Sequence, residues 1–166
     1  RGRSPKKSAL AFGVQQTNGD ILLSTDADSE VHPGWIKSMV STYDSNTGAV
    51  AGATMPKTSR GLHQRFYRLE RFMAAFTSAS AIGYGSPASV TGQNFSFRRA
   101  AFDDVGGYAH PGAASGDDDL MAQAIARQGW TVKFCADPAS VVADLRPPDP
   151  RSHLASASRH QSTIRF

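Results

Sequence analysis

The chain has 166 residues, of which 40% are hydrophobic and 19% are charged, so it can bury a core and is not compositionally disordered. Its 18 basic and 14 acidic residues leave a net charge of +4, which is too small to indicate nucleic-acid binding by itself. The single cysteine excludes an internal disulfide framework, and no apolar run approaches the ~18 residues of a membrane-spanning helix. The first residue is Arg1 and not methionine, so we expect a fragment of a larger protein.

The predicted elements alternate between helices and short buried strands along most of the chain. In chain order they are a helix over 5–18, a strand over 21–25, a helix over 33–43, a strand over 48–55, a helix over 60–79, a loop over 81–87, a strand over 90–97, a short helix around Phe102, a helix over 120–128 and strands over 131–135 and 140–143. This alternation predicts an α/β fold with a largely parallel sheet.

The helix predicted over 60–79 is amphipathic. Its apolar residues recur with a period near 3.6, at Leu62, Phe66, Leu69, Met73 and Phe76. Its basic residues interleave on the other faces, at Arg60, Arg65, Arg68 and Arg71. We interpret these arginines as the solvated face of the helix. A basic nucleic-acid-binding surface is the less favoured alternative.

Two aspartates follow the first predicted strand, with one residue between them. On an extended backbone residues two apart point the same way, so the carboxylates of Asp26 and Asp28 would converge beyond the carboxyl end of the strand. Open α/β sheets bind ligands at that edge, and Mg²⁺ or Mn²⁺ takes a few carboxylates together with water and substrate phosphates. The pattern therefore predicts a metal–diphosphate site, with a solvated acidic turn as the competing interpretation.

Three consecutive aspartates, Asp117, Asp118 and Asp119, stand at the entry of the helix predicted over 120–128. Adjacent carboxylates repel one another, and the positive end of the helix dipole offsets part of that repulsion. A carboxylate in this position can act as a general base toward a hydroxyl nucleophile. By themselves, however, the three residues are more simply explained as N-capping and first-turn acids.

Further motifs are recognisable when they are taken together in their order along the chain. They are Lys7-Ser8-Ala9-Leu10, Gly19 to Asp28, Pro33-Gly34-Trp35-Ile36, Thr91 to Arg99, Phe102 to Tyr108, and Ser115 to Leu120. This set resembles the catalytic core of a family 2 glycosyltransferase, of the branch related to cellulose and hyaluronan synthases. The resemblance extends from about Lys6 to Ala143, and the co-linear order is more specific than any single motif.

The resemblance implies a GT-A fold, a Rossmann-like α/β sheet that binds a nucleotide sugar, present here over residues 1–145 and truncated at its N-terminus. Residues 146–166 would form a Pro-rich turn and a basic C-terminal segment. The implied activity is inverting transfer of a sugar from a nucleotide-diphosphate sugar to an acceptor hydroxyl of a polysaccharide or a lipid-linked glycan. A non-catalytic relative that binds a nucleotide sugar or a metal is the alternative.

The resemblance also assigns roles to individual residues. The acidic pair Asp26 and Asp28 would contact the nucleotide and hold Mg²⁺ or Mn²⁺ on the diphosphate, where the metal acts as a Lewis acid on the leaving group. Asp118 would be the general base, with Asp117 beside it in the catalytic cluster. The other residues implied in nucleotide-sugar binding are Lys7, Gly92, Gln93 and Asn94.

Two features of the family are incomplete in this sequence. An earlier strand with an acidic residue that grips the base and ribose would precede Arg1, and a Gln-x-x-Arg-Trp motif aligns only imperfectly with residues 158–166. The implied partners are a UDP- or GDP-sugar and a glycan or lipid-linked acceptor, with no nucleic acid. The implied location is a membrane, with a cytoplasmic catalytic domain and with anchoring parts outside this chain.

Overall fold

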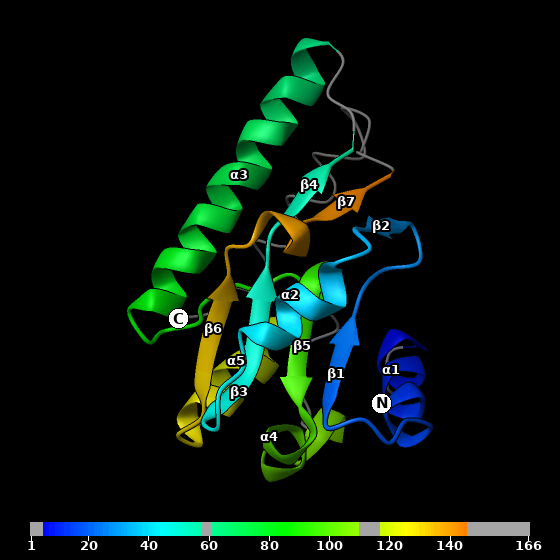
Figure 1. Cartoon of the computed structure of the whole chain (residues 1–166), viewed down its shortest axis with the longest axis vertical. Coiled ribbons are helices and arrows are strands. Elements are labelled where there is room, and N and C mark those ends of the chain that lie inside the picture. The colour runs from blue at the N-terminus through cyan, green and yellow to red at the C-terminus, as the bar shows by residue number, and fades with distance from the viewer. Residues whose placement is uncertain (1–4, 58–60, 110–116, 146–166) are drawn as a thin grey trace.

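A computed structural model describes residues 5–57, 61–109 and 117–145, and a four-stranded sheet lies at the centre of this part of the chain (Figure 1). In spatial order its strands are β1 (Ile21–Ser24), β5 (Phe95–Arg98), β3 (Thr47–Gly52) and β6 (Thr131–Cys135). β5 runs antiparallel to both of its neighbours, whereas β3 and β6 are parallel. The expectation of a largely parallel sheet is therefore wrong, because an apolar run indicates burial and not strand direction.

A second, smaller sheet lies beyond the carboxyl ends of β1 and β3 (Figure 1). Its order is β2 (Ser29–Val31), β7 (Val142–Asp144) and β4 (Thr54–Pro56), with β7 antiparallel to β2 and parallel to β4. The strand predicted over 48–55 is thus two strands, β3 and β4, which belong to different sheets. β2 was not predicted, because three residues are too few for a periodic pattern.

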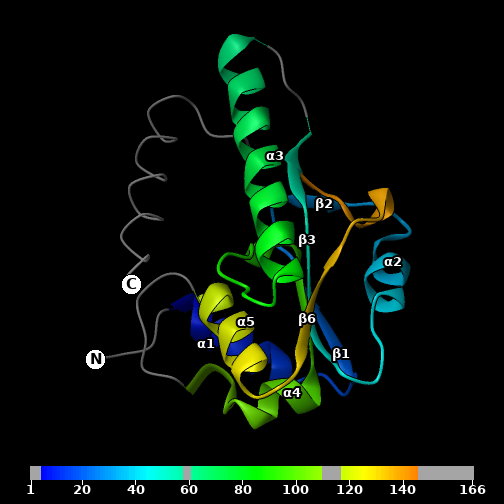
Figure 2. The same cartoon turned by 90° about the vertical axis from the view of Figure 1, so that its left-hand side faces the viewer.

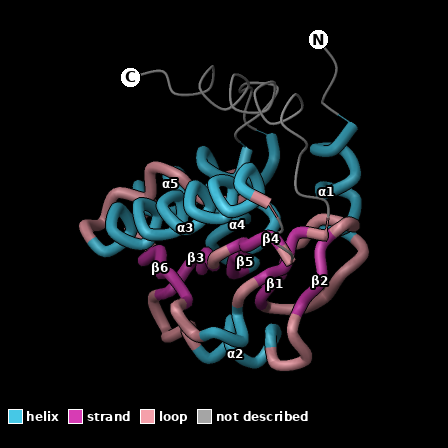
Figure 3. The backbone as a smooth tube through the Cα atoms, turned by 90° about the horizontal axis from the view of Figure 1, so that it is seen from above, coloured by secondary structure: helices cyan, strands magenta, loops and turns pink. Residues whose placement is uncertain are grey.

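Helices cover both faces of the main sheet, which gives three layers (Figures 2 and 3). α2 (Trp35–Ser41) lies on one face, and α3 (Leu62–Gly83), α4 (Arg99–Asp104) and α5 (Asp117–Arg127) lie on the other. α1 (Pro5–Gln15) lies at the β1 edge. The five helices agree with those predicted, but α3 extends four residues further, and the 3₁₀ turn η1 (Gly92–Asn94) replaces part of the strand predicted over 90–97.

The alternation of side chains along β3 divides the core into two apolar clusters. Ala49 and Ala51 point into the cluster that contains Phe95, whereas Val50 points into the cluster that contains Trp35. All six residues of β3 are buried, and small residues let the covering helices approach closely. A Cβ on Gly48, for example, would lie 2.7 Å from Cγ2 of Ile125 in α5. The core therefore holds β3 rigidly between the two helical layers.

The apolar residues of α3 lie on an unexpected side of the helix. Its buried residues are Tyr67, Ser78 and Ile82, and these face the sheets. Arg65 and Arg68 are exposed, as expected for a solvated face. However, all five apolar residues of the predicted periodic stripe are also exposed, from Leu62 to Phe76. Among the described residues, no helix combines the length and the apolar composition needed to cross a membrane.

Candidate active site

The end of β1 and the start of β5 meet at one edge of the main sheet. Because the two strands are antiparallel, Ser24, the last residue of β1, pairs with Phe95, the first residue of β5. The Ser24 hydroxyl donates a hydrogen bond to the Gly92 carbonyl oxygen at 3.4 Å. The acidic pair that follows β1 and the Gly92 turn that precedes β5 therefore lie at the same edge.

Asp26 and Asp28 lie in a turn and not on an extended strand. The Ser29 amide donates to the Asp26 carbonyl oxygen at 3.1 Å, and the Leu145 amide donates to the Asp28 carbonyl oxygen at 3.2 Å. The two carboxylates are therefore not aligned by an extended backbone, contrary to the expectation from sequence. Asp26 is half-buried and Asp28 is exposed, so the two residues differ in their access to solvent.

Asp118 lies against Gly92, although 26 positions separate the two residues in the sequence. A Cβ built on Gly92 would overlap the Asp118 carboxylate, with only 2.7 Å to its Cγ. Glycine is thus required at position 92 for the carboxylate to occupy this place. Two residues that the sequence analysis singled out from separate motifs are in direct contact.

The neighbouring carboxylate of Asp119 has a structural contact. Its Oδ1 accepts a hydrogen bond from the Val90 amide at 2.6 Å. This bond fixes the first turn of α5 to the segment that enters η1 and β5. Asp119 thereby helps to set the position of Asp118 relative to Gly92.

Asn94 is fully buried, and both polar atoms of its carboxamide are hydrogen-bonded. Its Nδ2 donates to the carbonyl oxygens of Ala53 and Ser140, both at 2.8 Å, and its Oδ1 accepts from Trp35 Nε1 at 3.0 Å. A Cβ on Gly52 would come within 2.8 Å of Asn94 Cγ, so β3 leaves room for this side chain. These contacts favour a role for Asn94 in holding the Gly92–Gln93 turn in place from the buried side.

One partner of Asn94 is held in place by a capped turn. Asp137 caps the 3₁₀ turn η3 (Pro138–Ser140), because its Oδ1 accepts from the Ala139 amide at 2.8 Å. This hydrogen bond, together with one from Ser38, holds the pKa of Asp137 below its usual range. The capped turn fixes the Ser140 carbonyl that Asn94 binds.

The remaining predicted site residues are less fully described. Gln93 is half-buried in η1, between Gly92 and Asn94. Lys7 lies in α1 and Asp117 begins α5, but both side chains are outside the described part of the structure. Within the described residues, no three His, Cys, Asp or Glu side chains are grouped so as to hold a metal ion.

Four residues that build this edge were not predicted from the sequence: Ser24, Trp35, Asp119 and Ser140. Trp35 belongs to the Pro-Gly-Trp-Ile motif and Asp119 to the aspartate cluster, so both lie in motifs that the sequence identified. In the structure, both make hydrogen bonds that support the site. Ser24 and Ser140 act through one hydroxyl and one backbone carbonyl, and no local pattern distinguishes such groups.

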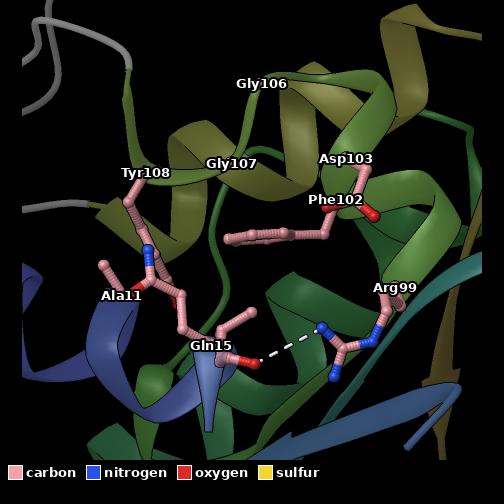
Figure 4. A pocket seen from close by; sticks show the side chains of 9 residues that line it. Ala11, Gln15, Arg99, Phe102, Asp103, Gly106, Gly107 and Tyr108 are labelled. Carbon is pink, nitrogen blue, oxygen red and sulfur yellow. Dashed lines mark hydrogen bonds between the residues drawn. The ribbon is translucent and has the colours of Figure 1, made fainter. Parts of the chain in front are cut away.

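A hollow of about 390 Å³ lies at the other end of the main sheet, between α1, α4 and the turn η2 (Gly107–Ala109) (Figure 4). The Arg99 guanidinium projects into its wall, but it donates to the carbonyl oxygens of Val14, Thr17 and Gly19. None of the predicted site residues lines this hollow. Its one arginine is engaged in joining α1 to α4, so we place the candidate site at the opposite edge.

Comparison with known proteins identifies the family. The model described as glycosyl transferase family 21 matches residues 1–147. The chain belongs to glycosyl transferase family 21. This confirms the glycosyltransferase class that the motifs predicted. The narrower expectation, membership of family 2 in its cellulose and hyaluronan synthase branch, is not confirmed by this match.

Two relatives of this family 21 chain are informative. A glucosyl-dolichyl phosphate glucuronosyltransferase of Haloferax volcanii is 30% identical over 115 residues, which are 66% of this chain and 36% of the relative. The solved structure of a mannosyltransferase from Pyrobaculum calidifontis, in complex with GDP-Man and Mn²⁺, is 22% identical and has a TM-score of 0.70. That match covers 99% of this chain and 41% of the mannosyltransferase, and it confirms the predicted GT-A fold. The family 21 chain thus spans roughly two-fifths of each relative's length.

Proposed function

We propose that this chain forms the catalytic core of an inverting glycosyltransferase, which transfers a sugar from a nucleotide-diphosphate sugar to a hydroxyl group of a lipid-linked acceptor. The observation that carries the proposal is the contact between the Asp118 carboxylate and Gly92. Gly92 is in turn hydrogen-bonded to Ser24, two residues before the acidic pair. A candidate base, a candidate sugar-binding turn and a candidate diphosphate site thus share one edge of the sheet.

Asp26 and Asp28 would hold the divalent metal, Mg²⁺ or Mn²⁺. Carboxylates suit these ions, which bind proteins through one or two such groups and complete their coordination with water and substrate phosphates. The GDP-Man and Mn²⁺ bound by the mannosyltransferase support a nucleotide-sugar donor and a divalent metal here. When bound, the metal would supply Lewis-acid stabilisation of the diphosphate leaving group.

Asp118 would act as the general base. The acceptor hydroxyl is a weak nucleophile, and a carboxylate within hydrogen-bond reach accepts its proton as the new bond to the sugar forms. Attack from the side opposite the diphosphate inverts the anomeric carbon, so no covalent enzyme intermediate is needed. Gly92 and Gln93 would line the sugar, Asn94 would position them, and Lys7 would face the nucleotide. Asp117 would stand beside the base.

The acceptor class rests on the relative from Haloferax volcanii. Its name specifies a glucosyl-dolichyl phosphate, which is a sugar carried on a lipid phosphate. A similar acceptor for this chain also supports membrane association of the protein that contains it.

Donor turnover in the Asp118→Asn variant tests the base. Asparagine preserves the shape but cannot accept the proton, so we expect kcat to fall by about 10²–10⁴-fold. Asp20→Asn is the matched control, since it removes one exposed carboxylate at the opposite end of β1. Undiminished turnover by Asp118→Asn would overturn the assignment.

A second variant tests the geometry without changing any charge. Gly92→Ala forces a methyl group into the Asp118 carboxylate, so kcat should fall although all carboxylates remain. Gly13→Ala is its control, because a Cβ there meets no atom within 4 Å. The unmodified protein also distinguishes an enzyme from a non-catalytic relative that binds a nucleotide sugar or a metal. Donor binding in calorimetry, with no turnover of any member of a donor panel, would favour the non-catalytic relative.

A further inference from the structure

The outward face of α3 carries a continuous apolar surface, which we call the apolar stripe. It consists of Leu62, Phe66, Leu69, Met73 and Phe76, spaced alternately by four and three residues. Their side chains are between 50% and 85% exposed, and Phe72 beside them is 55% exposed. At 1.5 Å per residue the stripe is about 21 Å long. Soluble proteins rarely expose so large a contiguous apolar patch without a binding partner.

The opposite face of α3 is already occupied. Tyr67, Ser78 and Ile82 are buried toward the sheets, and α3 packs against β4 and β6 (Figure 2). With 100° between successive residues, this buried face lies on the other side of the helix from the stripe. The stripe therefore faces away from the described core, and α3 can engage a partner without leaving the fold.

One flank of the stripe carries positive charge, whereas the exposed Glu70 lies on the opposite flank. Arg65 and Arg68 are both exposed, and the helical spacing places them along one flank of the stripe. An apolar face with arginines along its border is the pattern of a helix that lies in the plane of a bilayer, with its apolar side chains at the boundary between headgroups and acyl chains. Arginines at that depth are attracted to anionic headgroups.

Two hydrogen bonds connect α3 to the candidate active site. Near its C-terminal end, the Ser78 hydroxyl donates to the Ser89 carbonyl oxygen at 2.6 Å, three residues before Gly92. Near its N-terminal end, the Tyr67 hydroxyl donates to Asp144 Oδ2 at 3.4 Å, next to the Leu145 amide that binds the Asp28 carbonyl. A surface that fixes α3 would thus also fix the two loops that form the site.

We propose that the apolar stripe docks α3 in the plane of an anionic lipid bilayer. The border of arginines favours an anionic membrane over a neutral one. Residues 146–166 are a poor alternative occupant, because their large apolar residues are only Leu154, Ile164 and Phe166, and they include four arginines. The docking requires no catalysis, so it can be tested independently of the proposed reaction. It would also bring a lipid-linked acceptor close to the candidate site.

Vesicle sedimentation of the 166-residue chain, without donor or acceptor, tests this surface. The chain should bind vesicles of phosphatidylcholine mixed with phosphatidylglycerol more tightly than vesicles of phosphatidylcholine alone. Phe66→Ser combined with Phe76→Ser should weaken binding about 30-fold, from the loss of two inserted rings. Phe12→Ser combined with Ile36→Ser is the matched control, since these side chains are 63% and 61% exposed, against 62% and 60% for the stripe pair. The control should bind like the unmodified chain.

The arginine border is tested separately. Arg65→Gln and Arg68→Gln should each weaken binding to the anionic vesicles about fivefold and leave binding to neutral vesicles unchanged.

Equal binding by the stripe variant and the control would overturn the proposal. So would a melting temperature lowered by several degrees in the stripe variant, since that would mean the stripe is covered within the chain. A concentration-dependent dimer that the stripe variant abolishes, with no vesicle binding, would assign the face to a second copy instead.

Discussion

Asp118 and Asp119 are adjacent in the sequence, yet their carboxylates have different surroundings. Asp119 accepts a hydrogen bond from the Val90 backbone, whereas Asp118 lies against the α-carbon of Gly92. The first contact joins α5 to the lead-in of β5, and the second places a carboxylate beside a surface without a side chain. Within one aspartate cluster, Asp119 therefore fixes the helix to a neighbouring segment, while Asp118 is presented to the candidate site. The sequence alone could not show which aspartate has which role.

The buried hydrogen bonds of Asn94 should contribute to the stability of the fold. In Asn94→Asp the new carboxylate has no N–H groups for the carbonyl oxygens of Ala53 and Ser140, and it is a buried charge. We expect the free energy of unfolding to fall by about 2–4 kcal/mol, measured by urea denaturation. Asn18→Asp makes the same change at an exposed position and should cost less than about 0.5 kcal/mol. Equal effects in the two variants would contradict the role of Asn94 as a buried support.

At the scale of elements, the connection between α2 and β3 is held by one exposed carboxylate. Asp44 Oδ2 accepts from Lys133 Nζ of β6 at 2.7 Å, and Oδ1 accepts from the Thr47 hydroxyl at 2.7 Å and from the Asn46 amide at 3.0 Å. The hydrogen bond from Lys133, followed by those from Thr47 and Asn46, holds the pKa of Asp44 well below its ordinary value of 3.8. The turn is thereby fixed to the neighbouring strand.

This shift gives a pH-dependent prediction. A carboxyl group whose pKa is lowered by folding stabilises the folded state above its unfolded pKa, and that contribution is lost as the pH falls through the folded pKa. Asp44→Asn should therefore lower the melting temperature at pH 7, and the difference from the unmodified chain should shrink as the pH is lowered below 3.8. High salt should also reduce it, because the pair is exposed. A difference that does not vary with pH would contradict the ionic contribution of Asp44.

The sequence predicted most helices and the main strands, because each has a periodic or continuous apolar pattern of sufficient length. It missed the second sheet, since β2 and β4 have three residues each and β4 continues directly from the buried run of β3. The outward direction of the stripe on α3 was also not predictable. Periodicity defines an apolar face but not which face packs, and here the packed face uses Tyr67, Ser78 and Ile82 instead.

Ligand binding should stabilise the whole fold. A ligand that binds the folded state at about 100 times its Kd adds about 2.7 kcal/mol, or about 5–10 °C in melting temperature for a chain of this size. We expect this shift with a nucleotide-sugar donor and Mn²⁺, and its metal-dependent part should disappear on adding EDTA or in Asp28→Asn. Asp20→Asn should retain the full shift. A shift that survives both EDTA and Asp28→Asn would contradict the assignment of the acidic turn to metal.

The spatial arrangement of the candidate site residues could not be predicted from the sequence. Motif order along the chain singled out Asp28, Gly92 and Asp118 separately. The contact between Gly92 and Asp118 depends on where α5 begins, and the place of Gly92 beside the end of β1 depends on strand register; both are set by tertiary packing. In the same way, the burial of Asn94 follows from the space left at Gly52, which lies 42 positions earlier in the chain.

The direction of β5 determines whether the Gly92 turn lies at the same edge of the sheet as the acidic turn after β1. Ser24 ends β1 opposite the first residue of β5, so the segment entering β5 arrives where β1 finishes. A four-residue strand is about 13 Å long, and a parallel β5 in the same position would have moved Gly92 away from the acidic turn by about that length. A redesign that made every strand parallel could therefore preserve the buried core and still abolish the site.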